Sequence, residues 1–513
     1  MKFFKNPIKT SEDKRKLTRG ATTALIVALV LIFNVIFCYL TENLGWYVYR
    51  ARYTEDFTVS ETKSETFSSA IAAGREVEII FCMTEDALSK HSTGKQVLDT
   101  ARQLEKKYDG LIKLRFVNVL TQIDDESGER VALSKYAKTT DGKDAKLNRT
   151  SVIFKTTRNT GEEVFRTLTN VMGGTGFVDF YTLDSSGNVL SYNGETVIHA
   201  MLAWVLTDEH KVAYFTTGHG ESGDSLFVTL LAAAGYTVKS LNLQDEDVPQ
   251  NAALVVISGP KNDFEYSPDE LVMTECKRLE KYLESGGDVY LSLDPYVKKL
   301  PNIEGIIAKY GIELSETTVG EKLLRNIVRD PDNAITTDGY TLLSVPADGA
   351  TAKAVFDRIS GYTSGGILLR EVSALKLSGA AEAVLLSSAT SVAEVGGAVT
   401  DSDGSYPIAA LSKYRHDGAE SDTTVFVIPS IYLTASDALI SNSYLNREFL
   451  YSLCEEAFGA ENLPYGCNSV TYVSDRLTNL TMKTAKLYTA LLLTVPALVA
   501  AAGVVIIVRR KNR

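Results

Sequence analysis

Residues 211–221 read KVAYFTTGHGE, and this stretch decides the fold class. Val212 to Thr216 is a short apolar run, which is typical of a buried strand, and a glycine-rich turn follows it. Residues 225–234 then predict a helix that Gly235 ends. A buried strand, a tight turn and a helix in this order indicate a β-α-β unit, so we expect an α/β fold with a parallel sheet.

The alternation of strands and helices continues towards the carboxyl end. A helix at 268–285 has Ser267 as N-cap and proline at its first position, and Gly286 and Gly287 end it. Buried strands between helices predict a parallel sheet that is covered on both faces. The domain is predicted to span 195–462, with a smaller inserted lobe around 311–410. Its further strands are expected at 237–243, 253–258, 289–293, 367–369, 383–386 and 425–429, and its helices at 195–206 and 446–458.

A first α/β unit is predicted over residues 75–194. It begins with a strand at 77–81, a helix at 91–107 and a strand at 111–119, and further strands are expected at 151–155 and 177–183. This order is thioredoxin-like in outline. Cys82 is followed by Met, Thr and Glu, however, so the second thiol of a dithiol redox site is missing.

Both ends of the chain carry a long apolar run. Residues 21–40 and 487–508 contain no Asp, Glu, Lys or Arg, and each is long enough to cross a bilayer as a helix. Basic residues are dense in 1–20 and 509–513, outside the two runs. The sequence therefore predicts a two-span plasma-membrane protein with both termini in the cytoplasm.

Between the spans, this topology places a large external body. An external lead-in covers 41–74, and 463–486 returns the chain to the membrane. A cleavable signal peptide is the alternative for the first span, but its apolar run is too long and no small-residue cleavage site follows. We expect a retained anchor.

Composition limits the classes of function. The 513 residues allow about three folded units, and the formal charge of −11 with no basic, aromatic-rich stripe in the body argues against nucleic-acid binding. The cysteines lack metal-site or dithiol spacing, so no metal and no cofactor is expected. Cys454 and Cys467 are either a disulfide pair or buried free thiols.

The candidate ligand-binding residues follow predicted strands. In parallel sheets the carboxyl ends of strands open onto one edge, where ligands bind. Three predicted strand ends carry polar or glycine residues. These residues form either a ligand-binding site or simple structural turns. The candidates are Thr217, Gly218, His219, Gly220 and Glu221 after the first strand, Ser258 and Gly259 after the second, and Asp294 after the third.

Three enzyme motifs fit these residues only in part. Residues 218–225 have the spacing of a phosphate loop, but Asp224 replaces the lysine and would repel phosphate. Residues 223–226, GDSL, match the nucleophile block of one class of esterases, yet no late D-x-x-H pair follows. His219 and Glu221 resemble the H-x-E of zinc deaminases without the P-C-x-x-C that such enzymes need.

Three segments together resemble the GldG-like auxiliary components of ABC-2 type transporters, a family first named from gliding motility. They are KVAYFTTGHGE at 211–221, AALVVISGP at 252–260 and YLESGGDVYLSLDP at 282–295. The resemblance implies a central domain similar to class I glutamine amidotransferases, a flavodoxin-like parallel-sheet fold that an intraflagellar-transport protein also uses. Those enzymes carry G-x-C-x-G at a nucleophile elbow, and this chain has no such motif.

The resemblance implies a non-catalytic, membrane-anchored subunit whose external body binds a substrate or partner. Its partners would be an ABC-2 type permease and a separate cytoplasmic ATPase, and a carbohydrate or envelope polymer is a candidate ligand. Two alternatives stay open. One is an external hydrolase or carbohydrate-active enzyme that uses His219, Glu221 and Asp294; the other is an independent envelope scaffold protein.

Overall fold

The computed structural model describes residues 57–472 with short gaps, together with Thr22 and scattered residues between 486 and 509. Residues 57–472 belong to one compact body, within which we describe a first and a second α/β unit. The gaps are 62, 140–143, 170–179, 184–188, 209, 223–224, 361–365, 403, 440, 442, 462 and 464–465.

The predicted two-span membrane topology is contradicted. Among the described residues, no helix has both the length and the apolar character needed to cross a membrane. The 14-residue helix α4 (Gly94–Lys107) is among the longest, and at about 1.5 Å per residue it falls short of a hydrocarbon core about 30 Å thick. Membrane localisation, cytoplasmic termini and an external body are therefore withdrawn. The predicted spans, 21–40 and 487–508, lie almost wholly outside the described residues.

The first α/β unit contains a five-stranded sheet in the order β3-β2-β1-β4-β5. Strand β1 is parallel to β2 and antiparallel to β4, which is antiparallel to β5. Its strands are β1 (Val77–Phe81), β2 (Ile112–Asn118), β3 (Ile123–Asp124), β4 (Val152–Thr157) and β5 (Glu163–Leu168), and its helices are α2 (Glu65–Ala72), α3 (Glu85–Ser89), α4 and the 3-10 turn η1 (Ser134–Tyr136).

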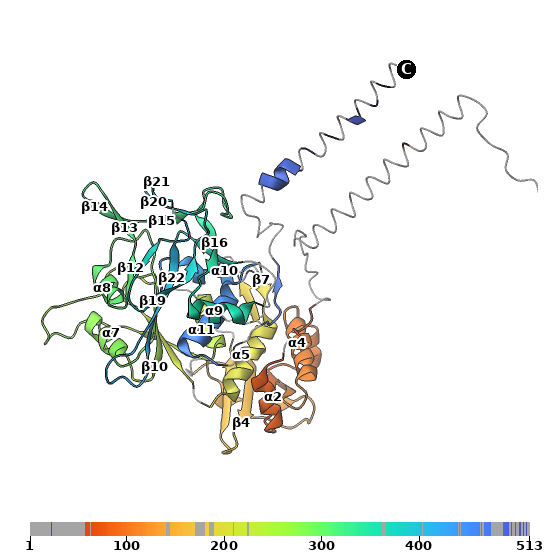
Figure 1. Ribbon diagram of the computed structural model, residues 1–513. Coiled ribbons are helices and arrows are strands. Elements are labelled where there is room, and N and C mark those ends of the chain that lie inside the picture. Colours follow the sequence, from red (N-terminus) through yellow and green to blue (C-terminus); the bar gives the residue numbers. More distant parts are fainter. Residues whose placement is uncertain are drawn as a thin grey trace, which may run out of the picture. The chain divides into compact units, whose positions relative to one another are not determined.

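Helix α5 (Gly194–Leu206) joins this unit to the rest of the body. It is buried on nearly all sides because it contacts α2, α4, β4 and β5 on the first unit and α6 (Ser225–Ala233) on the second. Figure 1 shows α5 beside α2 and α4. A small sheet of β6 (Tyr181–Leu183), β7 (Val189–Tyr192) and β24 (Val470–Thr471) brings the end of the described body back to the residues before α5.

A nine-stranded sheet forms the core of the second unit, in the order β17-β16-β19-β22-β23-β11-β10-β8-β9. The five strands from β23 to β9 are parallel, which confirms a mixed α/β fold with a parallel sheet. They are β8 (Val212–Thr216), β9 (Thr237–Leu241), β10 (Ala252–Ser258), β11 (Val289–Ser292) and β23 (Thr423–Ile428).

Residues 311–410 divide between this sheet and smaller ones. Four strands extend the parallel part in antiparallel fashion: β16 (Thr341–Pro346), β17 (Ile367–Arg370), β19 (Ala381–Leu386) and β22 (Pro407–Tyr414). The others form small sheets: β12 (Ile312–Leu314) with β18 (Leu375–Leu377), β13 (Glu316–Val319) with β14 (Lys322–Arg325), and β15 (Ile327–Arg329) with β20 (Val392–Val395) and β21 (Ala398–Asp401).

Alternate residues of the parallel strands pack into two separate cores. On β10, Leu254 and Val256 pack with α6 and with α11 (Asn446–Phe458), whereas Val255 and Ile257 pack with α7 (Glu275–Glu284) and α8 (Pro301–Lys309). This follows from the two-residue period of a strand. The helices therefore cover both faces of the sheet. Further helices in the described part of the chain are α9 (Ala350–Ile359), α10 (Ser436–Leu439) and the turn η3 (Tyr432–Thr434).

Helix α7 begins later than the sequence predicts. Instead of starting near Pro268, it starts at Glu275. The Ser267 hydroxyl accepts from the Asp269 amide (3.2 Å), and the Asp269 carboxylate accepts from the Leu271 amide (3.0 Å). Such local side-chain bonds replace helical ones and favour a turn.

Candidate functional site

The sheet reverses its order between β8 and β10. From β8 the chain crosses to β9 on one side and then to β10 on the other, so α6 and α7 lie on opposite faces. In open α/β sheets the crevice between the carboxyl ends of two such strands is where ligands bind. Residues 217–221, which we call the TGHGE loop, follow β8. Ser258 is the last residue of β10, and Gly259 comes directly after it. Most of the predicted site residues therefore lie at this reversal.

His219 is the centre of the TGHGE loop, and both ring nitrogens face carboxylates. Nε2 lies 3.0 Å from Oε2 of Glu275, and Nδ1 lies 3.4 Å from Oε1 of Glu221. The ring stacks on Phe264 with centroids 4.0 Å apart. Because His219 is only 3% exposed, this cluster is a buried brace between the loop and the start of α7.

Backbone hydrogen bonds complete this His219 brace. The His219 amide donates to Oε2 of Glu221 (2.8 Å), and the His219 carbonyl accepts from the amides of Lys261 and Asn262 (2.8 and 3.0 Å). The Glu265 amide donates to the same Glu275 oxygen that faces the imidazole (2.6 Å). The brace therefore fixes the loop after β8 against the segment after β10.

The charges of the brace stabilise one another. Burial opposes charging of the imidazole, but the Glu221 and Glu275 carboxylates outweigh it and raise the pKa of His219 above its usual 6.5. Burial likewise favours the neutral form of Glu221, but hydrogen bonding to His219 outweighs it and lowers the pKa of that carboxyl. An imidazolium between two carboxylates is the arrangement that these shifts favour.

The glycines of the loop allow close approach of polar neighbours. Gly218 and Gly220 have φ of 116° and 74°, which side chains rarely adopt. A Cβ on Gly218 would lie 3.3 Å from Oδ1 of Asn242, and one on Gly220 would lie 3.4 Å from Cβ of Lys261. Exposed or half-buried polar side chains therefore border the loop. We call this set the polar rim: Thr217, Asn242, Gln244, Lys261 and Asn262.

Ser258 and Gly259 lie against the same loop. Ser222 donates from its amide (2.8 Å) and its hydroxyl (3.2 Å) to the Ser258 carbonyl. A Cβ on Gly259 would lie 2.8 Å from the Ser222 hydroxyl and 2.7 Å from Cγ2 of Ile431. The Ser292 hydroxyl on β11 lies 3.4 Å from that of Ser258. The structure thus brings the first two predicted groups together.

Asp294 has different neighbours. It follows β11 at the same sheet edge, but its carboxylate accepts from the Tyr296 amide (2.9 Å) and its carbonyl accepts from Arg325 (2.8 Å). These contacts tie it to the β13–β14 hairpin. The structure shows no hydrogen bond between Asp294 and residues 217–221.

Sequence reasoning missed Glu275 and Phe264, the two partners that hold the His219 ring. Glu275 lies 56 residues beyond His219 and was placed inside a longer helix. Within that predicted helix Glu275 gave no chemical signal, because charged residues are common on the polar face of an amphipathic helix. Only the fold brings it under the loop.

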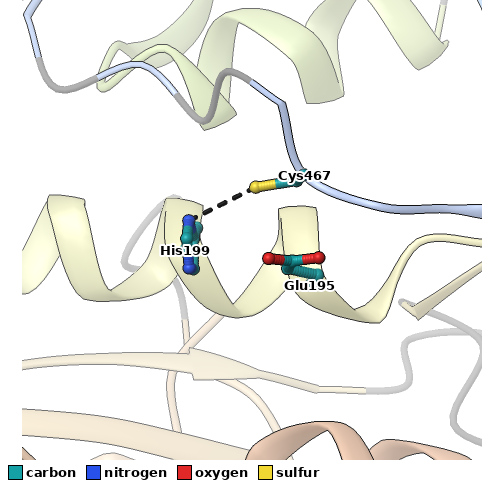
Figure 2. A group of neighbouring side chains, drawn as sticks. All are labelled: Glu195, His199 and Cys467. Atoms are coloured by element: carbon teal, nitrogen blue, oxygen red, sulfur yellow. Dashed lines mark hydrogen bonds between the residues drawn. The ribbon is translucent and has the colours of Figure 1, made fainter. Parts of the chain in front are cut away.

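A second buried cluster lies on α5. Figure 2 shows Glu195 and His199, one helical turn apart, facing Cys467 from the segment that passes over the helix. Their ligand atoms lie within 4.8 Å of one another, and Cys467 Sγ is 3.3 Å from His199 Nδ1. Glutamate, histidine and cysteine are ligand types that zinc accepts.

The hydrogen bonds of this cluster favour a structural role. Both Glu195 oxygens accept from the Ser60 amide (2.9 Å each), one also from the Ser60 hydroxyl (2.7 Å) and the other from the Asn468 amide (2.8 Å). Burial raises the pKa of the Cys467 thiol and lowers that of His199 to about 3, so both are neutral. The cluster fastens the first and last described segments of the body onto α5.

The sequence matches no family model and no curated protein. The solved structures to which the chain is similar, each over 48% of its length, include the mmIFT52 N-terminal domain (17% identity, TM-score 0.35, 96% of that chain), cytoplasmic protein STM3548 from Salmonella typhimurium (10%, 0.30, 98%) and PurLQS from Thermotoga maritima (11%, 0.25, 98%). Likenesses this weak assign no family and no activity.

Proposed function

We propose that this chain is a non-catalytic binding component of an ABC-type transport system, similar in role to the GldG-like auxiliary components. Under this proposal the first unit is thioredoxin-like, the second is amidotransferase-like, and the polar rim at the sheet reversal contacts a substrate or a partner. The family assignment rests on the three sequence segments that resemble the GldG-like proteins.

The His219 brace is the observation that carries the non-catalytic role. A general base presents a free nitrogen to its substrate. Each ring nitrogen of His219 faces a carboxylate instead, and the ring is buried. The hydrolase alternative also requires Asp294 beside this loop, whereas the contacts of Asp294 lie with Tyr296 and Arg325. A rigid loop that displays neighbouring polar groups suits recognition better than turnover.

The polar rim suits a ligand rich in hydroxyl groups. Amide and hydroxyl side chains both donate and accept hydrogen bonds, as sugar hydroxyls do, and Lys261 adds a donor. A carbohydrate or envelope polymer is therefore the proposed ligand class. The proposed partners are an ABC-2 type permease and a separate ATPase.

Affinity purification of the full chain in mild detergent tests the transport role. Recovery of an ATPase and a permease with the chain is the expected result. Reproducible recovery of the chain alone would contradict it.

Rim variants test the site. Asn242→Ala with Gln244→Ala is expected to weaken polymer binding about tenfold or more, because two amide partners are removed. Lys353→Ala on α9, an exposed residue distant from the rim in sequence, is the matched control. Polymer cleavage by the purified protein that is lost in His219→Gln would favour the hydrolase instead.

A further inference from the structure

Arg166, on the edge strand β5, is a buried cation with no counter-ion among the residues that the structure describes. It is 5% exposed, and its Nε and Nη1 atoms have no hydrogen-bond partner. The described residues supply no acid within ion-pair distance of it. Burial alone lowers the pKa of Arg166 to about 10, which no neighbouring carboxylate offsets.

Two aromatic side chains accompany the guanidinium. Its Cζ lies 4.8 Å from the Trp204 ring centroid, and the His210 ring is parallel to Trp204 at 3.9 Å. We call these three residues the Arg–Trp–His stack. The indole Nε1 of Trp204 and both ring nitrogens of His210 are also buried without a hydrogen-bond partner. Five nitrogen atoms of the stack thus have no hydrogen-bond partner within the described part of the chain.

Two further arginines, Arg75 and Arg158, contact residues near the end of α5, but their charges are matched. Arg75 precedes β1 and Arg158 follows β4, on the side where Val77 pairs with Thr156. Both arginines contact Asp208, which follows α5 (3.5 and 3.4 Å). Arg158 also pairs with Glu162 (2.9 Å). Arg166, by contrast, has no ion pair with any acid that the structure describes.

A cation–π contact does not offset this cost. Burying a charge without a partner is strongly unfavourable, and stacking on an aromatic ring returns only a small part of it. Buried polar groups without partners are rare in folded proteins and call for an explanation such as a bound ion. Because the unpartnered atoms are nearly all donors, the missing group is an acceptor with negative charge.

We propose that the Arg–Trp–His stack binds a small oxyanion group, a phosphate or a carboxylate. The guanidinium supplies the charge, and the indole and imidazole N–H groups supply further donors. His210 and Arg158 are only half-buried, which leaves a route from solvent. This site lies between β5 of the first α/β unit and the end of α5, and it shares no residue with the polar rim. An experiment can therefore disprove one of the two sites without affecting the other.

Trp204 provides a direct reporter. The chain has two tryptophans, so in a Trp46→Phe background Trp204 is the only one. Titration of the full chain with sodium phosphate, at constant ionic strength set by chloride, is expected to give a saturable change in Trp204 fluorescence. A parallel titration with acetate decides between a phosphate and a carboxylate.

Substitutions of Arg166 separate binding from structure. Arg166→Met is expected to weaken the anion response at least tenfold, and Arg166→Lys is expected to weaken it less. Without added anion, Arg166→Met is expected to unfold at the same or a higher temperature than the parent, since it removes an unmatched charge. Added phosphate is expected to stabilise only the parent. Arg329→Gln, which removes a paired arginine, is the control and keeps the full response.

His210→Gln gives a second variant with the arginine intact, and it is expected to bind more weakly. The proposal is overturned if neither anion gives a saturable response beyond that of chloride. It is equally overturned if Arg166→Met and the parent respond alike.

Discussion

Nε2 of His219 lies 3.0 Å from Oε2 of Glu275, a residue 56 positions further along the chain. The pair joins the loop after β8 to the first turn of α7, the helix that follows the neighbouring strand β10. Because both side chains are buried, the shape of the loop at the sheet reversal depends on this contact.

Removing the Glu275 charge is expected to destabilise the body. Glu275→Gln keeps the size of the side chain but leaves the His219 imidazolium short of one buried counter-ion. The free energy of unfolding is expected to fall by about 2–3 kcal/mol. Urea unfolding followed by circular dichroism measures it. Glu265→Gln, an exposed acid near the same brace, is the control and is expected to change stability by less than about 0.5 kcal/mol. Equal effects of the two substitutions would contradict the brace.

The framework of both units was predictable because its elements are local patterns. Strands β1 and β8 and helix α11 were predicted with the bounds that the structure has. Short apolar runs followed by glycine turns fix such elements without long-range information. The parallel pairing of β8, β10 and β11 followed from the same alternation.

Other features depend on distant contacts. Helix α7 begins later than the sequence predicted, because the side chains of Ser267 and Asp269 accept hydrogen bonds from nearby backbone amides. No sequence motif marks Glu275, Phe264 or the Arg–Trp–His stack. The neighbours of these residues come together only when β10, α5 and β5 are assembled. At the site, the order of the strand ends was predictable, whereas the burial of His219 and the separate contacts of Asp294 were not.

The His219 brace is expected to make stability depend on pH. The pKa of His219 is raised in the folded state, so its contribution is complete below the unfolded value of about 6.5 and is lost as pH rises through the higher folded value. The pKa of Glu221 is lowered, so its contribution is complete above about 4.5 and is lost as pH falls through the lower folded value. Between these limits the brace is strongest. The difference in unfolding free energy between the parent and His219→Gln is therefore expected to narrow from pH 6 to pH 9. A constant difference would argue against an imidazolium.

Gly259 is expected to tolerate no side chain. Its φ is 57°, and a Cβ would lie 2.7 Å from Cγ2 of Ile431, so Gly259→Ala adds backbone strain and overpacking. A loss of about 2–4 kcal/mol in unfolding free energy is expected. Gly379→Ala is the matched control, because Gly379 has a φ of 62° but no atom within 4 Å of the added Cβ, and it is expected to cost about 1 kcal/mol. Ile431→Ala is expected to restore part of the loss in Gly259→Ala. If Ile431→Ala does not restore any of the lost stability, the destabilisation in Gly259→Ala does not come from the contact with Ile431.

Glu195 is expected to hold both ends of the described body on α5. Its carboxylate accepts from the amides of Ser60 and Asn468, and Lys107 lies 3.9 Å away. Glu195→Gln replaces one acceptor oxygen by a donor, which faces N–H groups and cannot bond to them. Amide hydrogen exchange at Ser60 and Asn468 is therefore expected to become about tenfold faster or more, which corresponds to about 1.4 kcal/mol of local stability. Exchange within β8 is expected to change little, because the polar partners of Glu195 that the structure describes, Ser60, Asn468 and Lys107, all lie outside β8. A uniform rise across the body would instead mean that the substitution unfolds the whole unit, and unchanged exchange at both amides would exclude Glu195 as the fastening residue.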